Sequence, residues 1–378
     1  MKFGLLSKQT LTRGEVFADE LAARYGGTLP KLLAYYPVAQ MNPFQSTLYG
    51  ASKDAGYMIL PAFALHDVDT IRWKGRSIIH LHWLTQILRG VDDFHEGTKK
   101  IYAFIEMLDR WQQHGYKIVW TMHNVLPHNA ANVKLESYLR EKLVQKVDAI
   151  HIMNRNSIDI ASKYYAVPEE KKFFVPHPSF AEWYPNVINK ENSRAELHLR
   201  QDNFYFLHIG SISPYKKIED LIEAFIILSR SRPNALLLIA GFPSDKRYTS
   251  KIIDISMRSN AIAVHPIRLA ETQFQLYMNA CDIVVLPYET LNSGIAVLAY
   301  DFKKYCIGPS NSGVASVFSH DYELLYEHEQ PDGLLKMMQK ATSYDLSLIT
   351  YPKMQDIESI AVSKKFFDIL DSIIMYLH

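Results

Sequence analysis

Short apolar runs alternate with longer stretches of helical periodicity along the first part of the chain. Residues 76–83, 116–124 and 148–154, which read RSIIHLHW, YKIVWTMHN and DAIHIMN, are predicted strands. Between them, residues 101–115 and 135–147 repeat apolar side chains every three or four positions, which predicts helices. Strands that are apolar throughout are typical of a parallel sheet covered by helices on both faces. The first part is therefore predicted to be α/β.

The same alternation restarts after residue 203. Five further apolar runs, each followed by a predicted helix, are predicted strands at residues 204–212, 235–241, 261–266, 281–288 and 305–310. Five such units make a Rossmann-like domain, in which ligands bind beyond the carboxyl ends of the strands. We therefore expect functional residues in the loops that follow these strands.

The alternation is interrupted between residues 168 and 203, where prolines and polar residues are frequent. This composition is typical of a connecting segment. We expect an N-terminal Rossmann-like domain over residues 1–177, a C-terminal one over residues 178–355, and a closing amphipathic helix within residues 356–378. That helix is expected either to pack back on the first domain or to cap the second.

The composition is that of an ordinary globular protein. The 378 residues exceed what one hydrophobic core usually organises, and they are 48% hydrophobic and 21% charged. Lysine and arginine number 41 against 40 aspartates and glutamates, so the net charge gives no support to nucleic-acid binding. Cys281 and Cys306 lie in apolar segments without zinc-ligand spacing, which predicts buried thiols. Since no apolar run is long enough to span a membrane, we expect a cytoplasmic protein.

The most informative motif is LPYETLNSGIAVLAY at residues 286–300, where a strand, a polar turn and a helix start follow one another. Free N–H groups at a helix start bind phosphate, and a glycine there lets an anion approach closely. Thr290, Asn292 and Ser293 offer further hydroxyl and amide contacts beside Gly294. A diphosphate fits this arrangement, although Asn292 or Ser293 would equally supply an ordinary helix N-cap.

A second motif, GSISPYKK at residues 210–217, joins a strand to a helix. Lys216 and Lys217 are predicted at the start of that helix, where a positive charge opposes the helix dipole. A bound anion would offset this conflict. Solvated surface lysines are the alternative, more so for Lys217 than for Lys216.

A third group of candidates lies in the first domain. His123 and Asn124 end a predicted strand, and His128 follows in the same loop. A histidine there would serve as a general base or as a hydrogen-bond partner of a sugar or phosphate. Spacing alone would also allow a metal pair, but no carboxylate accompanies it, so no metal site is predicted. His80 and His82 alternate along another strand and are expected on opposite sides of it, so that at most one shares a cavity with His123.

Together these motifs resemble the GT-B glycosyltransferases, α/β proteins in which two Rossmann-like domains face each other across a cleft. The large retaining family of that fold has matching features at Gly210, Lys216, Ala240-Gly241, Asp282 to Pro287 and Ser293-Gly294. The motifs NPFQSTLYG, HLHW, WTMHNVLPH and LPYETLNSGIAVLAY are similar to those of bacterial exopolysaccharide and capsule transferases, including the xanthan-type β-mannosyltransferases.

The resemblance implies transfer of a sugar from a GDP- or UDP-sugar to a glycan or lipid-linked acceptor, without a further cofactor or metal. The first domain would hold the acceptor and the second the donor, with peripheral contact at the inner face of the membrane. Aromatic and basic residues between Lys31 and Phe44 add to the expectation of a lipid-linked acceptor. If the reaction inverts the anomeric centre, His123 or His128 would be the base. The donor site is expected at Gly210, Ser211, Lys216, Tyr288, Glu289, Thr290, Asn292, Ser293 and Gly294.

Two features depart from the large retaining family. That family has a pair of glutamates around this helix start, and the matching positions in this chain are Leu291 and Ala299, while Glu289 lies just outside them. That family also has an arginine directly after the glycine that corresponds to Gly210, and Ser211 occupies this position here. Retaining and inverting chemistry therefore both stay open. A catalytically inactive partner subunit of the same fold and a sugar-nucleotide epimerase are the alternative functions, although the motifs lack the carboxylates that an epimerase places over the sugar.

Overall fold

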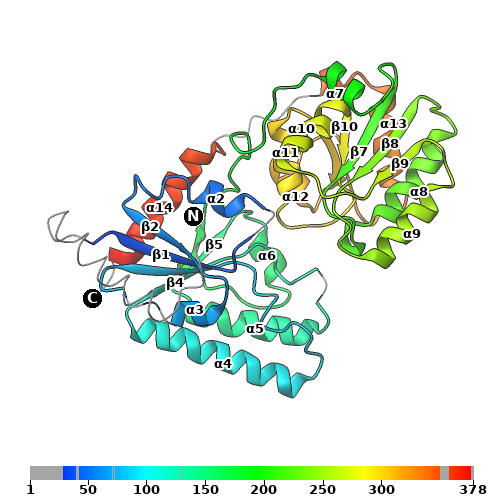
Figure 1. The fold of residues 1–378 in the computed structure, drawn as a ribbon. Helices are drawn as coiled ribbons and strands as arrows, with labels where there is room; N and C mark the ends of the chain where they lie inside the picture. Colours follow the sequence, from blue (N-terminus) through cyan, green and yellow to red (C-terminus); the bar gives the residue numbers. More distant parts are fainter. Residues whose placement is uncertain are drawn as a thin grey trace. The chain divides into compact units, whose positions relative to one another are not determined.

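The computed structural model describes residues 29–39, 42–69, 71, 73–128, 130–349 and 357–375. They form two compact units (Figure 1). The first contains the described residues up to Pro178 and from Glu358 onward, and the second runs from Ser179 to Ile357. The domain limits expected after residues 177 and 355 lie one and two residues from these boundaries.

A six-stranded parallel sheet forms the centre of the first unit. In spatial order its strands are β2 (Tyr57–Pro61), β1 (Lys31–Tyr36), β3 (Ser77–Leu81), β4 (Lys117–Thr121), β5 (Ala149–Ile152) and β6 (Lys172–Phe174). The predicted strands are β3, β4 and β5, whereas β1, β2 and β6 were not predicted. Strand β6 has only three residues and is defined by its pairing with β5, which the sequence pattern does not reveal.

Helices flank this sheet on both faces, namely α2 (Phe44–Leu48), α3 (Leu65–Asp69), α4 (Phe94–Gln113), α5 (Val133–Lys146), α6 (Ser157–Ala161) and α14 (Ser359–Met375). Figure 1 shows α4 and α5 side by side along one face, with α2 and α14 over the other. Helix α4 begins at Phe94 rather than at residue 101, because the Asp93 carboxylate accepts a hydrogen bond from the N–H of Glu96 at 2.7 Å.

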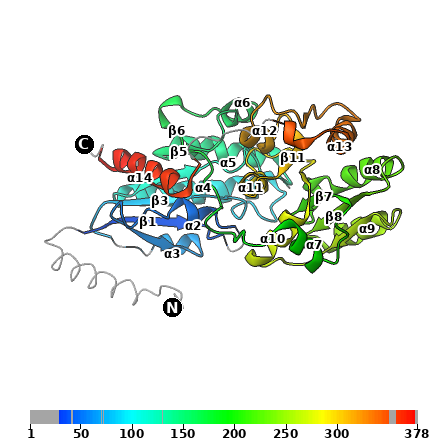
Figure 2. The same cartoon turned by 90° about the horizontal axis from the view of Figure 1, so that it is seen from above.

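The closing helix α14 packs on the first unit, one of the two placements that the sequence pattern allowed. It lies across the strands of the first sheet in the view from above (Figure 2), and its Phe366 and Phe367 are fully buried there. At its far end, the Asp371 carboxylate lies 2.5 Å from Nζ of Lys31 and accepts a hydrogen bond from the hydroxyl of Tyr57 at 2.7 Å. The first unit is therefore built from two segments far apart in the sequence.

The second unit has its own six-stranded parallel sheet. In spatial order its strands are β12 (Leu325–Tyr326), β11 (Tyr305–Pro309), β10 (Ile283–Val285), β7 (Phe204–Ile209), β8 (Ala235–Ala240) and β9 (Ile262–His265). The five strands predicted here are confirmed, and β12 is an addition of two residues at the edge. The helices are α7 (Lys190–Glu196), α8 (Ile218–Ser229), α9 (Lys246–Ser256), α10 (Glu271–Ala280), α11 (Gly294–Asp301), α12 (Gly313–Phe318) and α13 (Gly333–Ser343).

The expectation of a purely connecting segment between residues 168 and 203 was wrong in two places. Strand β6 completes the first sheet there, and α7 forms a helix of the second unit. Helix α7 is short and polar, so its sequence resembles a loop. Its start is fixed by Asn189, whose side chain accepts a hydrogen bond from the N–H of Asn192 at 2.8 Å.

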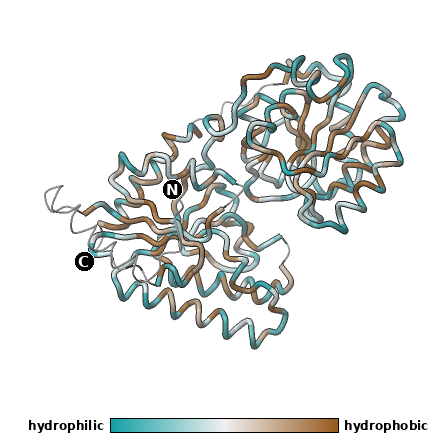
Figure 3. The backbone as a smooth tube through the Cα atoms, viewed as in Figure 1, coloured by the Kyte–Doolittle hydropathy of each residue, from teal (hydrophilic) through white to brown (hydrophobic). Residues whose placement is uncertain are grey.

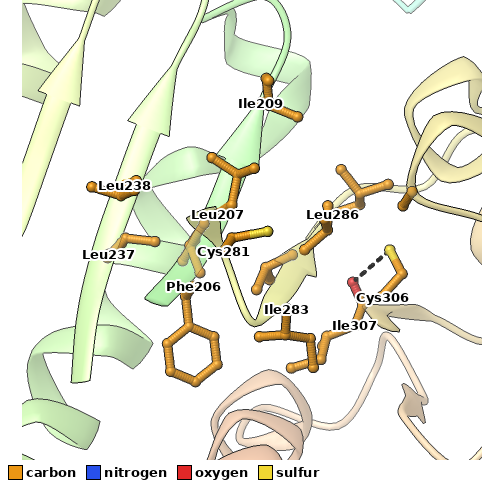
Figure 4. Packing of buried hydrophobic residues seen from close by; sticks show 14 of the residues in the cluster. Phe206, Leu207, Ile209, Leu237, Leu238, Cys281, Ile283, Leu286, Cys306 and Ile307 are labelled. Atoms are coloured by element: carbon orange, nitrogen blue, oxygen red, sulfur yellow. Dashed lines mark hydrogen bonds between the residues drawn. The ribbon is translucent and has the colours of Figure 1, made fainter. Parts of the chain in front are cut away.

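Apolar residues concentrate in the strands and line the cores of both units (Figure 3). In the second unit, Phe206, Leu207 and Ile283 are fully buried between the sheet and its helices (Figure 4). Cys281 and Cys306 are free buried thiols, as predicted, and burial raises the pKa of Cys281 to about 12. Among the helices of the described residues, none is long and apolar enough to cross a membrane.

Candidate functional site

The strand order of the second sheet reverses between β7 and β10. The chain adds β8 and β9 on one side of β7, and then returns to add β10, β11 and β12 on the other. Open parallel sheets bind ligands at such a switch point, in the crevice beyond the carboxyl ends of the strands. The segments that leave β7 and β10 here are residues 210–217 and 286–294, so the fold brings together the two motifs identified in the sequence.

Two glycines bring the loops after β7 and β8 into direct contact. Gly210 and Gly241 have φ angles of 124° and 151°, a conformation that other residues rarely adopt. A Cβ atom added to Gly241 would lie 1.5 Å from the carbonyl oxygen of Gly210. Only glycine fits at position 241, because the backbone of one loop rests on that of the other.

Lys216 is a buried cation at this switch point. It ends the short 3₁₀ turn Pro214–Lys216, and only 7% of its surface is exposed. Its Nζ lies 3.6 Å from the ring centroid of Tyr288 and 4.9 Å from that of Tyr215. No carboxylate of the described chain forms an ion pair with it, and burial lowers its pKa to about 7. The site therefore favours an anionic ligand that would balance this charge.

Lys217 was considered as a solvated surface lysine, but in the structure its side chain contacts other polar side chains. It precedes α8 in the left-handed conformation, with φ of 50°. Its Nζ lies 2.6 Å from Nε2 of His328 and 3.7 Å from the Glu289 carboxylate. Glu289 also accepts a hydrogen bond from the Asn311 amide. Glu289 is thus held in a polar cluster beside the expected donor site.

Ser293 is the N-cap of α11, and its hydroxyl accepts a hydrogen bond from the N–H of Ala296 at 3.2 Å. The ordinary capping role considered from the sequence is therefore present. It does not use the first two N–H groups of the helix, those of Gly294 and Ile295, which donate to no atom of the described residues. They point to a place where an anion can bind.

The turn before α11 is closely packed against the start of α12. The N–H of Gly313 donates to the carbonyl of Thr290 at 2.6 Å, and a Cβ on Gly313 would lie 2.7 Å from the nitrogen of Ser293. The Thr290 hydroxyl is buried without a partner among the described residues, whereas Asn292 is partly exposed. The hydroxyl of Ser211 lies 3.4 Å from that of Ser213 in the facing loop.

Sequence reasoning missed His208, which lies in β7 and is close enough to Lys216 to feel its charge. It is fully buried, and its Nδ1 lies 3.0 Å from the carbonyl oxygen of Val285. Burial and the nearby Lys216 lower its pKa to about 3, so the ring is neutral. A histidine inside an apolar strand is read from sequence as a core residue, and only the fold reveals its neighbour.

The first unit has a separate candidate site at the carboxyl end of β4. A small pocket of about 20 Å³ there is lined by residues that include Trp83, Trp120, His123 and Arg140. The ring of His123 stacks on Trp83 with centroids 3.9 Å apart, and Phe44 meets it edge-on at 4.8 Å. Burial lowers the pKa of His123 well below its usual value, so the imidazole is neutral and can accept a proton.

The expectation that His80 and His82 face opposite sides of their strand was wrong. Their rings lie 4.2 Å apart, and both contact the hydroxyl of Tyr49 at 2.7 Å. Side chains alternate along a strand with a period of two, so residues two apart point to the same face. Both histidines consequently lie beside His123, and Nδ1 of His82 is 2.9 Å from its Nε2.

Three further expectations for the first unit concern His128, metal binding and lipid contact. His128 is exposed and is not among the residues that line the pocket of His123. The described residues hold no group of three or more histidines, cysteines or carboxylates that could bind a metal ion. Among the described residues between Lys31 and Phe44, Lys31 is ion-paired with Asp371, and Tyr36 and Phe44 are buried, so these three side chains are not available for a lipid contact.

Comparisons with known proteins agree with this architecture. The family model described as "Glycosyl transferases group 1" matches residues 189–349, which include every part of the switch-point site. The chain is 26% identical to the GDP-mannose:glycolipid 4-beta-D-mannosyltransferase of Xanthomonas campestris pv. campestris over 309 residues, covering 80% of each protein.

Solved structures agree on the fold. Sucrose-phosphate synthase from Thermosynechococcus elongatus superposes with a TM-score of 0.63 at 12% identity, covering 92% of this chain and 96% of that one. Anabaena Alr3699/HepE in complex with UDP and glucose gives 0.59 at 14% identity, covering 92% and 97%. The predicted fold and the predicted resemblance are both confirmed. The protein is a glycosyltransferase of the GT-B fold, and its residues 189–349 match the model of the group 1 glycosyl transferases.

Proposed function

We propose that the protein transfers a sugar, mannose in the first instance, from a GDP-sugar to a glycan or lipid-linked acceptor in the synthesis of a cell-surface polysaccharide or glycolipid. The choice of GDP-mannose rests on the name of the Xanthomonas relative, and a UDP-sugar is the alternative donor. The observation that carries a diphosphate donor is the buried ammonium group of Lys216, which has no carboxylate partner among the described residues.

The donor diphosphate would lie between Lys216 and the start of α11. Its oxygens would accept hydrogen bonds from the N–H groups of Gly294 and Ile295, with the positive end of the helix dipole directed at them. These charges and dipoles are fixed before the reaction, so they can stabilise the diphosphate as it leaves with the bonding electrons. A metal-independent reaction is part of this proposal, since Lys216 would supply the balancing charge.

The nucleoside would lie against the loops that follow β8 and β9. Phe242 and Ile267 in these loops are exposed by 40% and 42%, respectively, which is unusual for large apolar side chains. A purine or pyrimidine ring could cover either of them. The loops are held at the switch point by the contact between Gly210 and Gly241.

His123 would take the proton from the acceptor hydroxyl. The relative's name specifies a β-linked product from GDP-mannose, and nucleotide-linked mannose is the α-anomer, so that transfer inverts the anomeric centre. Inversion needs a base for the attacking hydroxyl, and the neutral imidazole of His123 lines a pocket that Trp83 and Arg140 also line. We therefore propose inverting chemistry. Membrane contact and a lipid acceptor rest on the relative alone, and vesicle flotation would test them.

The first experiment is a thermal-shift screen of the purified protein with GDP, UDP and their common sugars. We expect one nucleotide class to raise the melting temperature, Lys216→Ala to abolish the shift, and the exposed-lysine control Lys336→Ala to keep it. A shift with GDP-mannose alone would fix the donor. Absence of any shift with every nucleotide would refute the donor site and favour an inactive partner subunit.

A further inference from the structure

A continuous chain of buried hydrogen bonds leads to His123 across the first sheet. We call it the histidine relay, and its members, in order, are His151, Thr121, His80, Tyr49, His82 and His123. Each member is at most 9% exposed. Strands β3, β4 and β5 supply the histidines and the threonine from their carboxyl ends, and Tyr49 follows α2. The relay ends at the proposed base, so its direction determines which nitrogen of His123 can accept a proton.

The direction is set at the inner end, where Nε2 of His151 lies 2.9 Å from the carbonyl oxygen of Val175. A carbonyl only accepts, so Nε2 carries the hydrogen. Burial lowers the pKa of His151 to about 4, which leaves the ring neutral and makes Nδ1 an acceptor. The hydroxyl of Thr121, 2.9 Å from Nδ1, must then donate to it.

The same reasoning fixes the middle of the relay. The only hydroxyl hydrogen of Thr121 is already used, so its oxygen accepts from Nε2–H of His80 at 2.6 Å. Burial lowers the pKa of His80 well below its usual value, so its Nδ1 is an acceptor and takes the hydroxyl hydrogen of Tyr49 at 2.7 Å. The oxygen of Tyr49 then accepts from Nε2–H of His82, also at 2.7 Å.

At the outer end, Nδ1 of His82 is the acceptor nitrogen of a ring that burial keeps neutral. It accepts from Nε2–H of His123 at 2.9 Å. His123 is itself neutral, so with its hydrogen on Nε2 its other ring nitrogen, Nδ1, carries none. Every hydrogen in the relay is therefore assigned by one backbone carbonyl, that of Val175, which directly follows β6, three strands away from β3 in the order of the sheet.

Reversing all the bonds would give the opposite tautomer of His123. It would also direct a lone pair of His151 at the carbonyl of Val175, so that one buried hydrogen bond is lost. Such a loss favours the direction set by Val175 by a factor of about 10 to 100. If Thr121 were an apolar residue, the outer part of the relay could reverse without this loss, since His80, Tyr49 and His82 would keep the bonds among themselves.

We propose that the histidine relay holds His123 in the tautomer with hydrogen on Nε2 and the acceptor at Nδ1, which makes Tyr49, Thr121 and His151 positioning residues for the transfer reaction. This role rests on the proposed function of His123. In that step the acceptor O–H bond breaks and its proton binds Nδ1, while the oxygen bonds the anomeric carbon and the diphosphate leaves with the electron pair. The positioning residues act through His123 and do not touch the substrate.

The test is the tautomer of His123, measured by NMR on full-length protein containing ¹⁵N-labelled histidine, with the His123 signals assigned through a His123→Gln variant. We expect the Nε2–H form alone in the wild type. We expect a mixture of both tautomers in Thr121→Val, because the link to Val175 is broken. Thr121→Ser keeps a hydroxyl, so it should restore the single tautomer and serves as the matched control.

Turnover measurements on the same variants connect the tautomer to the reaction. Thr121→Val should lower kcat at least twofold with little change in donor KM, and Thr121→Ser should recover it. An Nδ1–H or mixed tautomer in the wild type would overturn the relay, and so would a pure Nε2–H form in a folded Thr121→Val. If Thr121→Val does not fold, Tyr49→Phe breaks the relay at another point and is judged by the same signals. Full activity of His123→Gln would instead refute the proposed base while leaving the tautomer result intact.

Discussion

Lys216 is a buried charge at the proposed diphosphate site. The aromatic rings of Tyr288 and Tyr215 attract its ammonium group but do not neutralise it. The free protein therefore carries a desolvated cation whose burial opposes folding. Such a penalty is removed when an anion binds, so part of the stability of the protein should appear only with ligand.

This penalty predicts a pH dependence for Lys216→Met. Below pH 7 both the folded and the unfolded wild type hold the proton, so the penalty is complete and the variant should be the more stable protein. Above pH 7 the folded form loses its proton first, because its pKa is about 7 against 10.5 for an ordinary lysine. The unfolded form then binds more protons, so the wild type should gain on the variant by up to about 1.4 kcal/mol per pH unit.

Urea unfolding of both proteins between pH 6 and pH 9 measures this difference. Lys336→Met, at an exposed position, is the control and should show a constant difference from the wild type. A difference for Lys216→Met that does not change with pH would show that the ammonium group is not desolvated as the structure indicates.

At the scale of elements, the loops that follow β7 and β8 are in close backbone contact beside the proposed donor site. Gly210 and Gly241 share the positive φ region, but only Gly241 faces another backbone. A Cβ on Gly210 would meet Ile295 at 3.6 Å, which is ordinary contact. Substitutions at the two positions therefore distinguish the cost of the backbone conformation from the cost of a collision with the neighbouring backbone.

We predict that Gly241→Ala is much more damaging than Gly210→Ala. Alanine at position 210 should destabilise the second unit by about 1–3 kcal/mol, the usual penalty of a strained backbone conformation. Alanine at position 241 adds a collision with the Gly210 carbonyl and should prevent normal folding of that unit. Urea midpoints of the two variants test this, and equal midpoints would mean that the loops separate easily.

The sequence predicted elements well where a strand and its helix are both regular. All five strands expected in the second unit are present, and residues 286–294 and 210–217 were correctly linked to strand ends. Strands β1, β2 and β6 were missed, because short strands depend on pairing with neighbours that are distant along the chain. The helix α7 was missed because its polar sequence lacks an apolar period, and its cap supplies the signal instead.

At the scale of the whole molecule, the last helix belongs to the first unit. Helix α14 buries Phe366 against His80 and His151, with ring centroids 5.3 Å from each. Helix α14 thus packs directly against the histidine relay. The complete core of the first unit therefore includes α14, although the second unit lies between α14 and the rest of the first unit in the sequence.

Phe366→Ala should destabilise the first unit alone. Loss of a fully buried phenylalanine typically costs about 3–5 kcal/mol. Hydrogen exchange followed by mass spectrometry should show faster exchange in β1, β3 and β4, with the strands of the second unit unchanged. Lys364→Ala, on the exposed face of the same helix, should leave both units protected. Equal loss of protection in both units would contradict the division into two independent cores.

The sequence by itself determined the α/β class, the two parallel-sheet units, and the location of candidate residues such as Lys216 and His123 beyond strand ends. These features depend on local periodicity and on the order of strand, loop and helix. Only the tertiary structure decided that Lys216 is buried over Tyr288 and that Val175 sets the hydrogen-bond direction reaching His123. Burial and hydrogen-bond direction depend on neighbours brought together by the sheet, and no local pattern encodes such neighbours.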